Sequence, residues 1–181
     1  LEKAVGYINQ GHQLIAGSVN LTFRTKPLSA AACYEKLYAF DQEKNARFGR
    51  SATANLVGQA ELFTKFPFNA TAETGEDFKW TTRAVARGTR LLYAEDVLVS
   101  HPARESLREL LAKAKRVSKQ SRDSPSLSRG SGLPFRHYFS VYIVPPSRSR
   151  SRECSREERF LAHATSLLVQ VTKLWFFVRS R

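Results

Sequence analysis

The sequence predicts an α/β fold, and three observations support this prediction. Residues 13–23 alternate loosely between apolar and polar positions and are rich in branched side chains, which is typical of a strand. Residues 76–87 have the composition of a helix and end at Gly88. Residues 90–94 and 97–101 then form two short predicted strands. Strands and helices that follow one another in this way indicate a sheet with flanking helices.

The remaining elements of the first 119 residues follow from local signals. Gly17 marks the place of a bulge in the first predicted strand. Pro27 and Ser29 open a helix whose apolar residues fall on one side at helical spacing. The other predicted elements are, in order, a loop over 42–50, a short apolar run over 52–57, one or two helical turns over 60–66, a loop over 67–75 and a basic amphipathic helix over 103–119.

The charge of the chain is distributed unevenly. The 181 residues carry 29 Lys and Arg against 16 Asp and Glu, a net charge of +13 that first suggests a polyanionic partner. Residues 1–101 hold 12 basic and 10 acidic residues, whereas residues 102–181 hold 17 basic and 6 acidic. Most of the excess, +11, therefore belongs to an attached C-terminal segment and not to the predicted α/β region.

That C-terminal segment divides by composition. Residues 121–132 and 145–156 are rich in Ser, Arg, Pro and Gly, which predicts irregular structure. In residues 157–178, one apolar stripe (Phe160, Ala164, Leu167, Val171, Leu174 and Val178) resembles that of an interfacial helix more than that of a spanning one. We therefore expect three parts: an α/β part over 1–118, a basic irregular linker over 119–156 and an amphipathic helix over 157–181.

Several familiar signatures are absent from the sequence. It contains no P-loop, no GxGxxG, no HExxH and no zinc-spaced set of Cys and His. Its two cysteines, Cys33 and Cys154, require no disulfide framework, so a reducing compartment is expected. The chain opens at Leu1 without Met and without a secretory signal, which we interpret as the interior of a longer protein, with processing of the N-terminus as the alternative.

The stretch most informative about chemistry surrounds two adjacent carboxylates. Glu76 and Asp77 follow Gly75 at a predicted loop-to-helix junction. An inward Asp in this position can accept a proton from a sugar hydroxyl as a general base. The alternative is that both acids only cap the helix and favour its dipole.

The order of motifs around these acids resembles the second half of a family 2 glycosyltransferase. The motifs are Thr53-Ala54-Asn55, Phe66-Pro67-Phe68, Gly75-Glu76-Asp77, a helix closed by Gly88, Leu91-Leu92-Tyr93-Ala94 and His101-Pro102-Ala103-Arg104, with Tyr38-Ala39-Phe40-Asp41-Gln42-Glu43 in support. The resemblance covers residues 7–117. It implies a partial GT-A fold, a mixed sheet with flanking helices, and transfer of a sugar from a nucleotide-sugar donor to an acceptor hydroxyl with inversion.

The resemblance also implies roles for single residues. Asp77 matches the catalytic base, and Glu76 would shape the acceptor pocket or orient the base. Asn55 matches a residue near the donor and acceptor sugars, and Trp80 matches an aromatic that could line the acceptor site, with a core role as its alternative. The same set of substrate-binding candidates includes Arg83. His101 matches a histidine that some relatives place on the metal, with a hydrogen-bonded strand-end role as its alternative.

The sequence also departs from the family. The resemblance implies a divalent cation, Mg²⁺ or Mn²⁺, held by an Asp-x-Asp motif, and no such motif occurs in the chain. The turn at Phe66-Pro67-Phe68 lacks a glycine that relatives have before the proline. We therefore expect the base and acceptor side of a membrane-associated enzyme of cell-envelope polysaccharide synthesis, without its donor and metal half. The expected partners are a nucleotide-sugar and a saccharide or lipid-linked acceptor, and the expected location is cytoplasmic, with peripheral contact at the inner membrane face left open.

Two other interpretations remain open at this stage. Arg148, Arg150 and Arg152 alternate with Ser, and aromatic residues between 135 and 142 could stack on bases, so the chain could be a basic RNA-binding or anionic-surface-binding protein without catalysis. The aromatic residues are not interleaved with the Arg-Ser run, which disfavours nucleic acid as the partner. The third interpretation is a truncated gene product with no activity.

Overall fold

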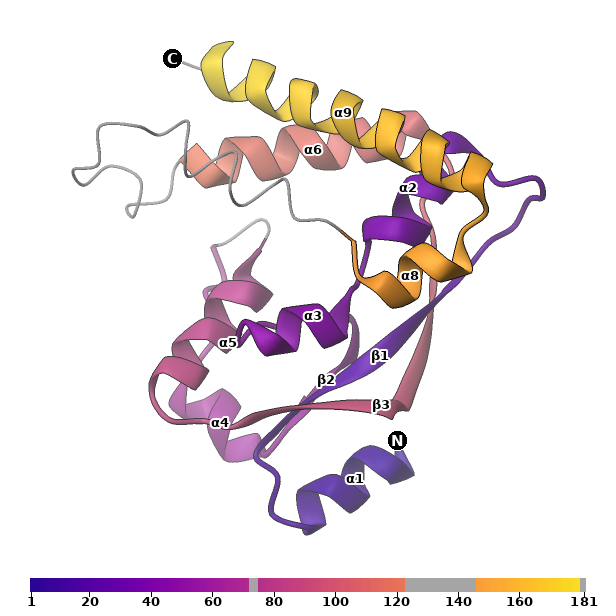
Figure 1. Ribbon diagram of the computed structural model, residues 1–181. Helices are drawn as coiled ribbons and strands as arrows, with labels where there is room; N and C mark the ends of the chain where they lie inside the picture. The colour runs from indigo at the N-terminus through magenta and orange to yellow at the C-terminus, as the bar shows by residue number, and fades with distance from the viewer. Residues whose placement is uncertain (72–74, 123–145, 180–181) are drawn as a thin grey trace. The chain divides into compact units, whose positions relative to one another are not determined.

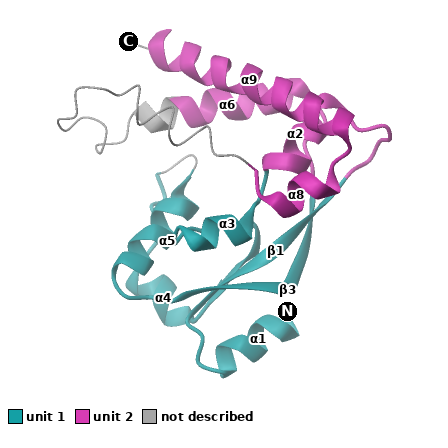
Figure 2. Cartoon of the chain, in the orientation of Figure 1, with its two compact units in different colours: residues 1–22, 39–102 teal, residues 23–38, 103–181 magenta. Residues whose placement is uncertain are grey.

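The computed structural model describes residues 1–71, 75–122 and 146–179, with the side chains of 119–122 left out. The described chain divides into two compact units, residues 1–22 with 39–102 and residues 23–38 with 103–181 (Figure 2). The three parts expected from composition, with boundaries at residues 118 and 156, stay predictions. The aromatic residues between 135 and 142, on which the RNA-binding interpretation depends, lie outside the described residues.

Unit 1 contains the sheet and the helices around it (Figure 1). Its elements are α1 (Glu2–Asn9), β1 (Leu14–Thr22), α3 (Gln42–Arg47), the 3₁₀ turn η1 (Thr53–Asn55), β2 (Leu56–Gly58), α4 (Ala60–Lys65), α5 (Glu76–Ala86) and β3 (Leu91–Pro102). In unit 2 the described elements are the helices α2 (Ala30–Tyr38), α6 (Leu107–Arg122), α8 (Arg148–Glu153) and α9 (Arg156–Arg179).

The sheet of unit 1 has three strands in the order β2-β1-β3. β2 is antiparallel to β1, with Leu14 opposite Gly58, and β3 is parallel to β1, with Leu14 opposite Leu91. The expected α/β class and mixed sheet are therefore confirmed. A parallel pair requires a crossover connection, and residues 23–90 provide it between β1 and β3.

Helices cover both faces of this sheet. Neighbouring residues of a strand point to opposite faces, so Leu14 and Ile15 belong to different cores. Leu14 packs with residues of α4 and α5, among them the fully buried Trp80. Ile15 packs with Ala4 of α1 and with Ala94 and Val97 of β3.

A bulge interrupts the pairing of β1 with β3. Gly17 pairs with Ala94, but Ser18 pairs with Leu98, so the extra residues lie in β3. The irregularity expected at Gly17 is present, whereas the two separate strands predicted for 90–94 and 97–101 form one strand with the bulge between them. The Oγ of Ser18 donates to the Glu95 carbonyl over 2.7 Å, which satisfies one of the backbone groups that the bulge removes from the ladder.

Three helices of the structure were not predicted. α1 precedes the first expected strand, α8 lies in the segment expected to be irregular, and α3 replaces the loop predicted for 42–50. α3 forms because Asp41 caps its N-terminus and accepts a hydrogen bond from the backbone N–H of Lys44 over 3.3 Å. The other predicted helices are present, with α6 beginning later than expected, at Leu107.

Unit 2 is built on small and apolar contacts between helices. Ala31 of α2, Leu110 and Ala114 of α6 and Val169 of α9 form one buried cluster. Cys33 and Leu37 form a second cluster with Cys154 and Ala162, in which both cysteines are free thiols. Burial is the main cause that raises the pKa of each thiol above its ordinary value.

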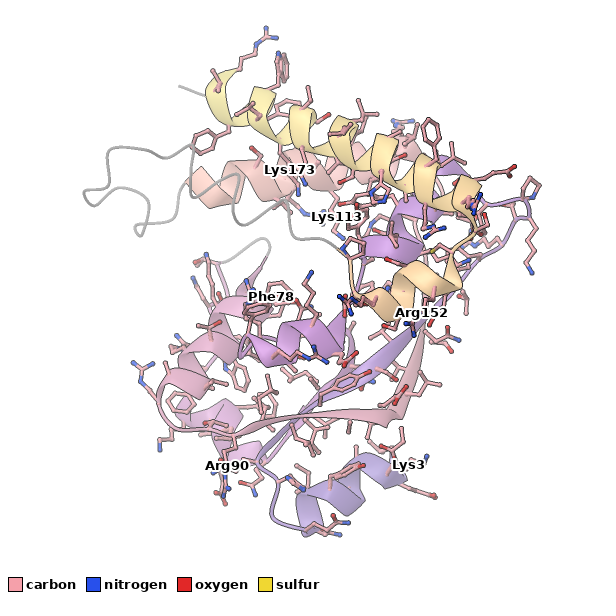
Figure 3. The ribbon with its side chains drawn as sticks, in the orientation of Figure 1. Lys3, Phe78, Arg90, Lys113, Arg152 and Lys173 are labelled. Atoms are coloured by element: carbon pink, nitrogen blue, oxygen red, sulfur yellow. The ribbon has the colours of Figure 1, made fainter. Side chains whose placement is uncertain are left out.

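A buried carboxylate also holds the helices of unit 2 together. Glu35 of α2 is fully buried and accepts from Arg104 over 3.2 Å, and Lys113 of α6 lies 3.7 Å from its other oxygen. Lys173 of α9 lies near Lys113 and is also buried (Figure 3). The Glu35 carboxylate therefore faces two cations, and a third cation, Lys173, lies near one of them. Burial of positive charge without its own carboxylate is costly.

α9 is long and apolar enough to cross a membrane by length and composition, although only 22% of its most apolar window is buried within the protein. No other described helix meets this test. The amphipathic pattern of residues 157–178 favours an interfacial helix over a spanning one.

The bulge predicts the effect of a methyl group at Gly17. A Cβ there would lie 2.3 Å from the Asn55 Nδ2 and 2.4 Å from the Val97 carbonyl oxygen. We expect Gly17→Ala to lower the free energy of unfolding by about 1–3 kcal/mol, because one of these neighbours is backbone and cannot move cheaply. Gly6→Ala is the control, since a Cβ in that helical position meets nothing within 4 Å and should raise stability by roughly 0.5–1 kcal/mol. Urea unfolding measures both, and equal effects of the two changes would contradict the argument.

The burial of Lys173 predicts a pH dependence of stability. Burial, with a smaller contribution from Lys113, lowers the pKa of Lys173 from 10.5 to about 8. Between these values the unfolded chain binds more protons than the folded chain, so the Lys173 contribution to stability rises with pH. We expect Lys173→Met to be more stable than the wild type at about pH 7, by on the order of 1–3 kcal/mol, and this advantage to shrink towards about pH 10. An advantage that stays constant over this range in urea unfolding would show that the charge is not its cause.

Candidate functional site

The two predicted catalytic carboxylates lie in the first turn of α5 and point to different segments. Gly75 precedes them in the left-handed region at φ 67°, a conformation that favours glycine. Glu76 accepts from the backbone N–H of Asn69 over 2.8 Å. Asp77 accepts from the backbone N–H of Thr53 over 3.4 Å. Glu76 thus holds the loop before α5, while Asp77 reaches the turn η1.

Asn55 lies at the other end of η1 and fills the bulge between β1 and β3. Its Nδ2 donates to the carbonyls of Ser18 over 2.7 Å and of Val97 over 2.8 Å, and the residue is 5% exposed. Both amide hydrogens therefore have backbone partners from the two strands. The predicted contact of Asn55 with substrate stays a prediction. In the structure its amide bridges the two strands at the bulge.

A buried polar network connects this turn to α3 and α5. The Gln42 amide donates to the carbonyls of Ala52 and Asn55 and accepts from the Ala52 N–H. Thr81 of α5 accepts from the Ser51 N–H over 3.1 Å and donates to the Asp77 carbonyl over 2.9 Å. Residues 51–55 are thus held by α3 on one side and by α5 on the other. Their position relative to Asp77 depends on these hydrogen bonds.

Gln42 and Thr81 were not identified from the sequence. Both are almost fully buried, at 2% and 0% exposure. Gln42 stands in a polar stretch that indicated a loop, and the cap at Asp41 was the available signal for a helix. Thr81 stands one helical turn after Asp77, a spacing that places the two on one face of α5. That spacing is the signal that could have found Thr81.

Trp80 belongs to the core, in agreement with the alternative reading of this residue. It is fully buried, and its indole N–H donates to the Phe66 carbonyl. The rings of Phe63 and Phe68 each stack on it at 4.9 Å between centroids. Phe68 is 39% exposed, so it carries the accessible aromatic surface of this stack.

Arg83 lies about one turn after Trp80 on α5 and also contacts the loop over residues 66–69. Its Nη2 donates to the Pro67 carbonyl over 2.7 Å, and its Nε is buried without a hydrogen-bond partner within the described part of the chain. Glu76, Trp80 and Arg83 are spaced by four and three residues and therefore share one face of the helix. All three bind backbone groups of residues 66–69, so this face holds the loop in place.

His101 lies further along β3 than the bulge. It follows Val97 by four residues, which is about 13 Å along an extended strand. Its Nδ1 donates to the Pro102 carbonyl over 2.8 Å, and its ring lies 4.6 Å from that of Phe40. These contacts correspond to the strand-end alternative, and the metal role stays a prediction.

The described residues do not fit a divalent cation site. Within residues 1–71, 75–122 and 146–179, no three His, Cys, Asp or Glu side chains gather where they could hold a metal ion. A surface hollow among Arg24, Thr25, Glu105 and Glu109 belongs to unit 2, whereas all the predicted site residues belong to unit 1. The carboxylates of that hollow are engaged in part, because Glu105 accepts from Thr25 over 2.7 Å.

Comparison with known proteins finds similarity to part of a glycosyltransferase. No protein-family model matches the sequence. The chain is 32% identical over 122 residues to the glycosyltransferase AglE of Haloferax volcanii, an alignment that covers 66% of this chain and 40% of the relative. The chain therefore spans about two fifths of the relative's length. An α/β unit with this similarity is compatible with part of a glycosyltransferase domain.

The two hydrogen bonds donated by the Asn55 amide predict the effect of replacing its NH₂ group by an oxygen. In Asn55→Asp, a carboxylate would face the carbonyl oxygens of Ser18 and Val97, and we expect a loss of at least about 3 kcal/mol of stability. Asn69→Asp is the matched control, because the Asn69 side-chain oxygen accepts from Thr71 and an aspartate can accept in the same way. Urea unfolding of both variants is the measurement. A stability loss no larger than that of the control would show that the amide does not bridge the bulge.

Proposed function

We propose that this chain carries the base and acceptor side of an inverting family 2 glycosyltransferase of GT-A type, with Asp77 as the general base. The observation that carries the proposal is the position of Asp77 at the start of α5, where the motif order of the family expects the base. The similarity to a glycosyltransferase over 122 residues supports the general class.

The surroundings of Asp77 suit a base that must be oriented. A carboxylate has about four lone-pair positions; the Thr53 N–H occupies one of them on Oδ2, and the Phe78 N–H occupies one on Oδ1 over 2.9 Å. The remaining positions can accept the proton of an acceptor hydroxyl. As that proton moves to the carboxylate, the hydroxyl oxygen forms a bond to the anomeric carbon and the nucleotide diphosphate leaves from the opposite face, which inverts the configuration.

The loop over residues 66–69 is the proposed wall of the acceptor site. Glu76, Trp80 and Arg83 hold its backbone, so their contribution to binding passes through the loop. Phe68 on this loop offers an exposed ring on which the apolar face of a sugar can stack. We propose Phe68 as the aromatic contact, in the place that the sequence suggested for Trp80.

The donor side of the reaction is proposed to lie outside the described residues. The complete enzyme would use a nucleotide-sugar, a saccharide or lipid-linked acceptor and Mg²⁺ or Mn²⁺ bound by an Asp-x-Asp motif. The described residues do not supply such a cation site. Synthesis of cell-envelope polysaccharide in the cytoplasm, at the inner membrane face, remains the proposed setting.

The base assignment predicts a loss of activity without a loss of fold. In the full-length protein we expect Asp77→Asn to lower kcat by about 10²–10⁴-fold, because an amide cannot take up the acceptor proton. Asp41→Asn is the matched control, since asparagine also caps a helix and this acid is not placed in the reaction. Transfer of labelled sugar measures activity, and urea unfolding checks the fold. Normal transfer by Asp77→Asn would exclude Asp77 as the base.

A further inference from the structure

The helix α9 turns its most apolar side away from unit 2. Its buried residues are Ala162, Thr165, Val169 and Lys173, which pack in unit 2. The large apolar residues lie on the opposite side: Phe160, Leu167, Leu168, Val171, Trp175 and Val178 are between 44% and 72% exposed. We call these six residues the apolar face of α9.

This apolar face is continuous and uncharged. Between residues 160 and 178 the only Asp, Glu, Lys or Arg is Lys173, which is buried on the other side of the helix. At about 1.5 Å per residue the face extends for about 27 Å. A patch of this kind on an isolated chain indicates an interaction surface.

Basic residues occur on α6, which lies beside α9, and at the C-terminal end of α9. α6 and α9 run in the same direction, since Ala114 packs with Val169 and the Ser118 hydroxyl donates to the Lys173 carbonyl (Figure 1). On α6, Lys115 and Arg116 are exposed, whereas Lys113 pairs with the buried Glu35. At the end of α9, the Arg179 guanidinium lies 4.7 Å from the Trp175 ring.

We propose that the apolar face of α9 docks on an anionic lipid membrane, with the helix in the plane of the interface and the Arg179 cation at its C-terminal end on the headgroups. The apolar side chains enter the boundary between headgroups and acyl chains, and basic residues near the surface strengthen binding to anionic lipid. Trp175 beside Arg179 suits this boundary, where aromatic rings and snorkelling cations are frequent. The proposal does not rest on the transferase function.

The packing of unit 2 favours an interfacial helix over a spanning one. α6 lies alongside α9 and carries exposed cations, among them Lys115 and Arg116. A spanning α9 would have to leave α6 or carry these charges into the hydrocarbon. Docking on the surface buries the apolar face and leaves the contacts of Ala162, Val169 and Lys173 as they are.

The same observations favour lipid over a second copy of the chain. The apolar residues at 160, 164, 167, 171, 174 and 178 have the spacing of a coiled-coil seam, but Leu161, Leu168 and Trp175 add a third row and make the face wider than a two-stranded seam. Two copies docked in parallel would also bring their basic ends together. An anionic surface is complementary to that charge, whereas a parallel second copy is not.

Binding of the 181-residue chain to lipid vesicles tests the proposal. We expect the wild type to co-sediment with phosphatidylcholine vesicles containing phosphatidylglycerol at least about tenfold more tightly than with phosphatidylcholine alone, and to lose this preference at high salt. The triple variant Leu167→Ser, Val171→Ser, Trp175→Ser should bind both vesicle types at least about tenfold more weakly. The control variant Val5→Ser, Phe48→Ser, Leu98→Ser removes three exposed apolar residues of unit 1 and should bind as the wild type does.

Trp175 provides a readout of depth in the same experiment. Brominated lipids should quench the fluorescence of Trp175 but not that of the buried Trp80, and Trp175→Phe should abolish the quenching. Absence of binding by the wild type, or equal binding by the triple and control variants, would overturn the proposal. A wild-type dimer in light scattering that the triple variant dissociates, without a change in vesicle binding, would overturn it in favour of a second copy.

Discussion

The amide of Asn55 is the contact on which the arrangement of unit 1 depends. The bulge removes carbonyls of β1 and β3 from the sheet ladder, and buried carbonyls without donors are costly. The two hydrogens of one amide satisfy two of them, at Ser18 and Val97. A side chain so placed also fixes its own backbone, and the turn η1 therefore lies directly against the sheet. Gly17 has no Cβ because Asn55 occupies that space.

The turn η1 is in turn held by α5, which contacts two different loops with two of its faces. Asp77 and Thr81, one turn apart, hold residues 51–53 through backbone N–H groups. Glu76, Trp80 and Arg83 hold the loop 66–69 through other backbone groups. A single helix thus sets the distance between two loops, and the first turn of that helix contacts both, through Asp77 and Glu76. The orientation of the Asp77 carboxylate therefore depends on the contacts that hold α5 and η1 in unit 1.

The sequence predicted those parts of the fold whose signals are periodic. β1 could be found because its residues are rich in branched apolar side chains, and the apolar helices because their apolar residues repeat at every third and fourth position. β3 was divided at Glu95 and Asp96 because two acids inside a strand resemble a turn, whereas the bulge leaves them exposed. α3 was missed because a short polar helix has no such period and depends on the cap at Asp41. The motif order predicted Asp77 as the candidate base, which stays a prediction. The buried contacts of Gln42 and Thr81 were not predicted, since a buried hydrogen bond between distant residues leaves no local pattern.

The orientation of α9 shows why a period alone cannot decide what a helix faces. Its sequence is apolar on more than one side, and the wider side carries most of its large apolar residues. The packing selected the smaller side, because Ala162 and Val169 lie in clusters with Ala31, Cys33 and Ala114, where helix backbones approach closely. Close approach excludes rings and long branched chains, so Phe160 and Trp175 remain outside although they are more apolar. A helix that packs through its small residues leaves its large apolar residues exposed for another binding surface. The charge near those residues then favours one kind of partner over another.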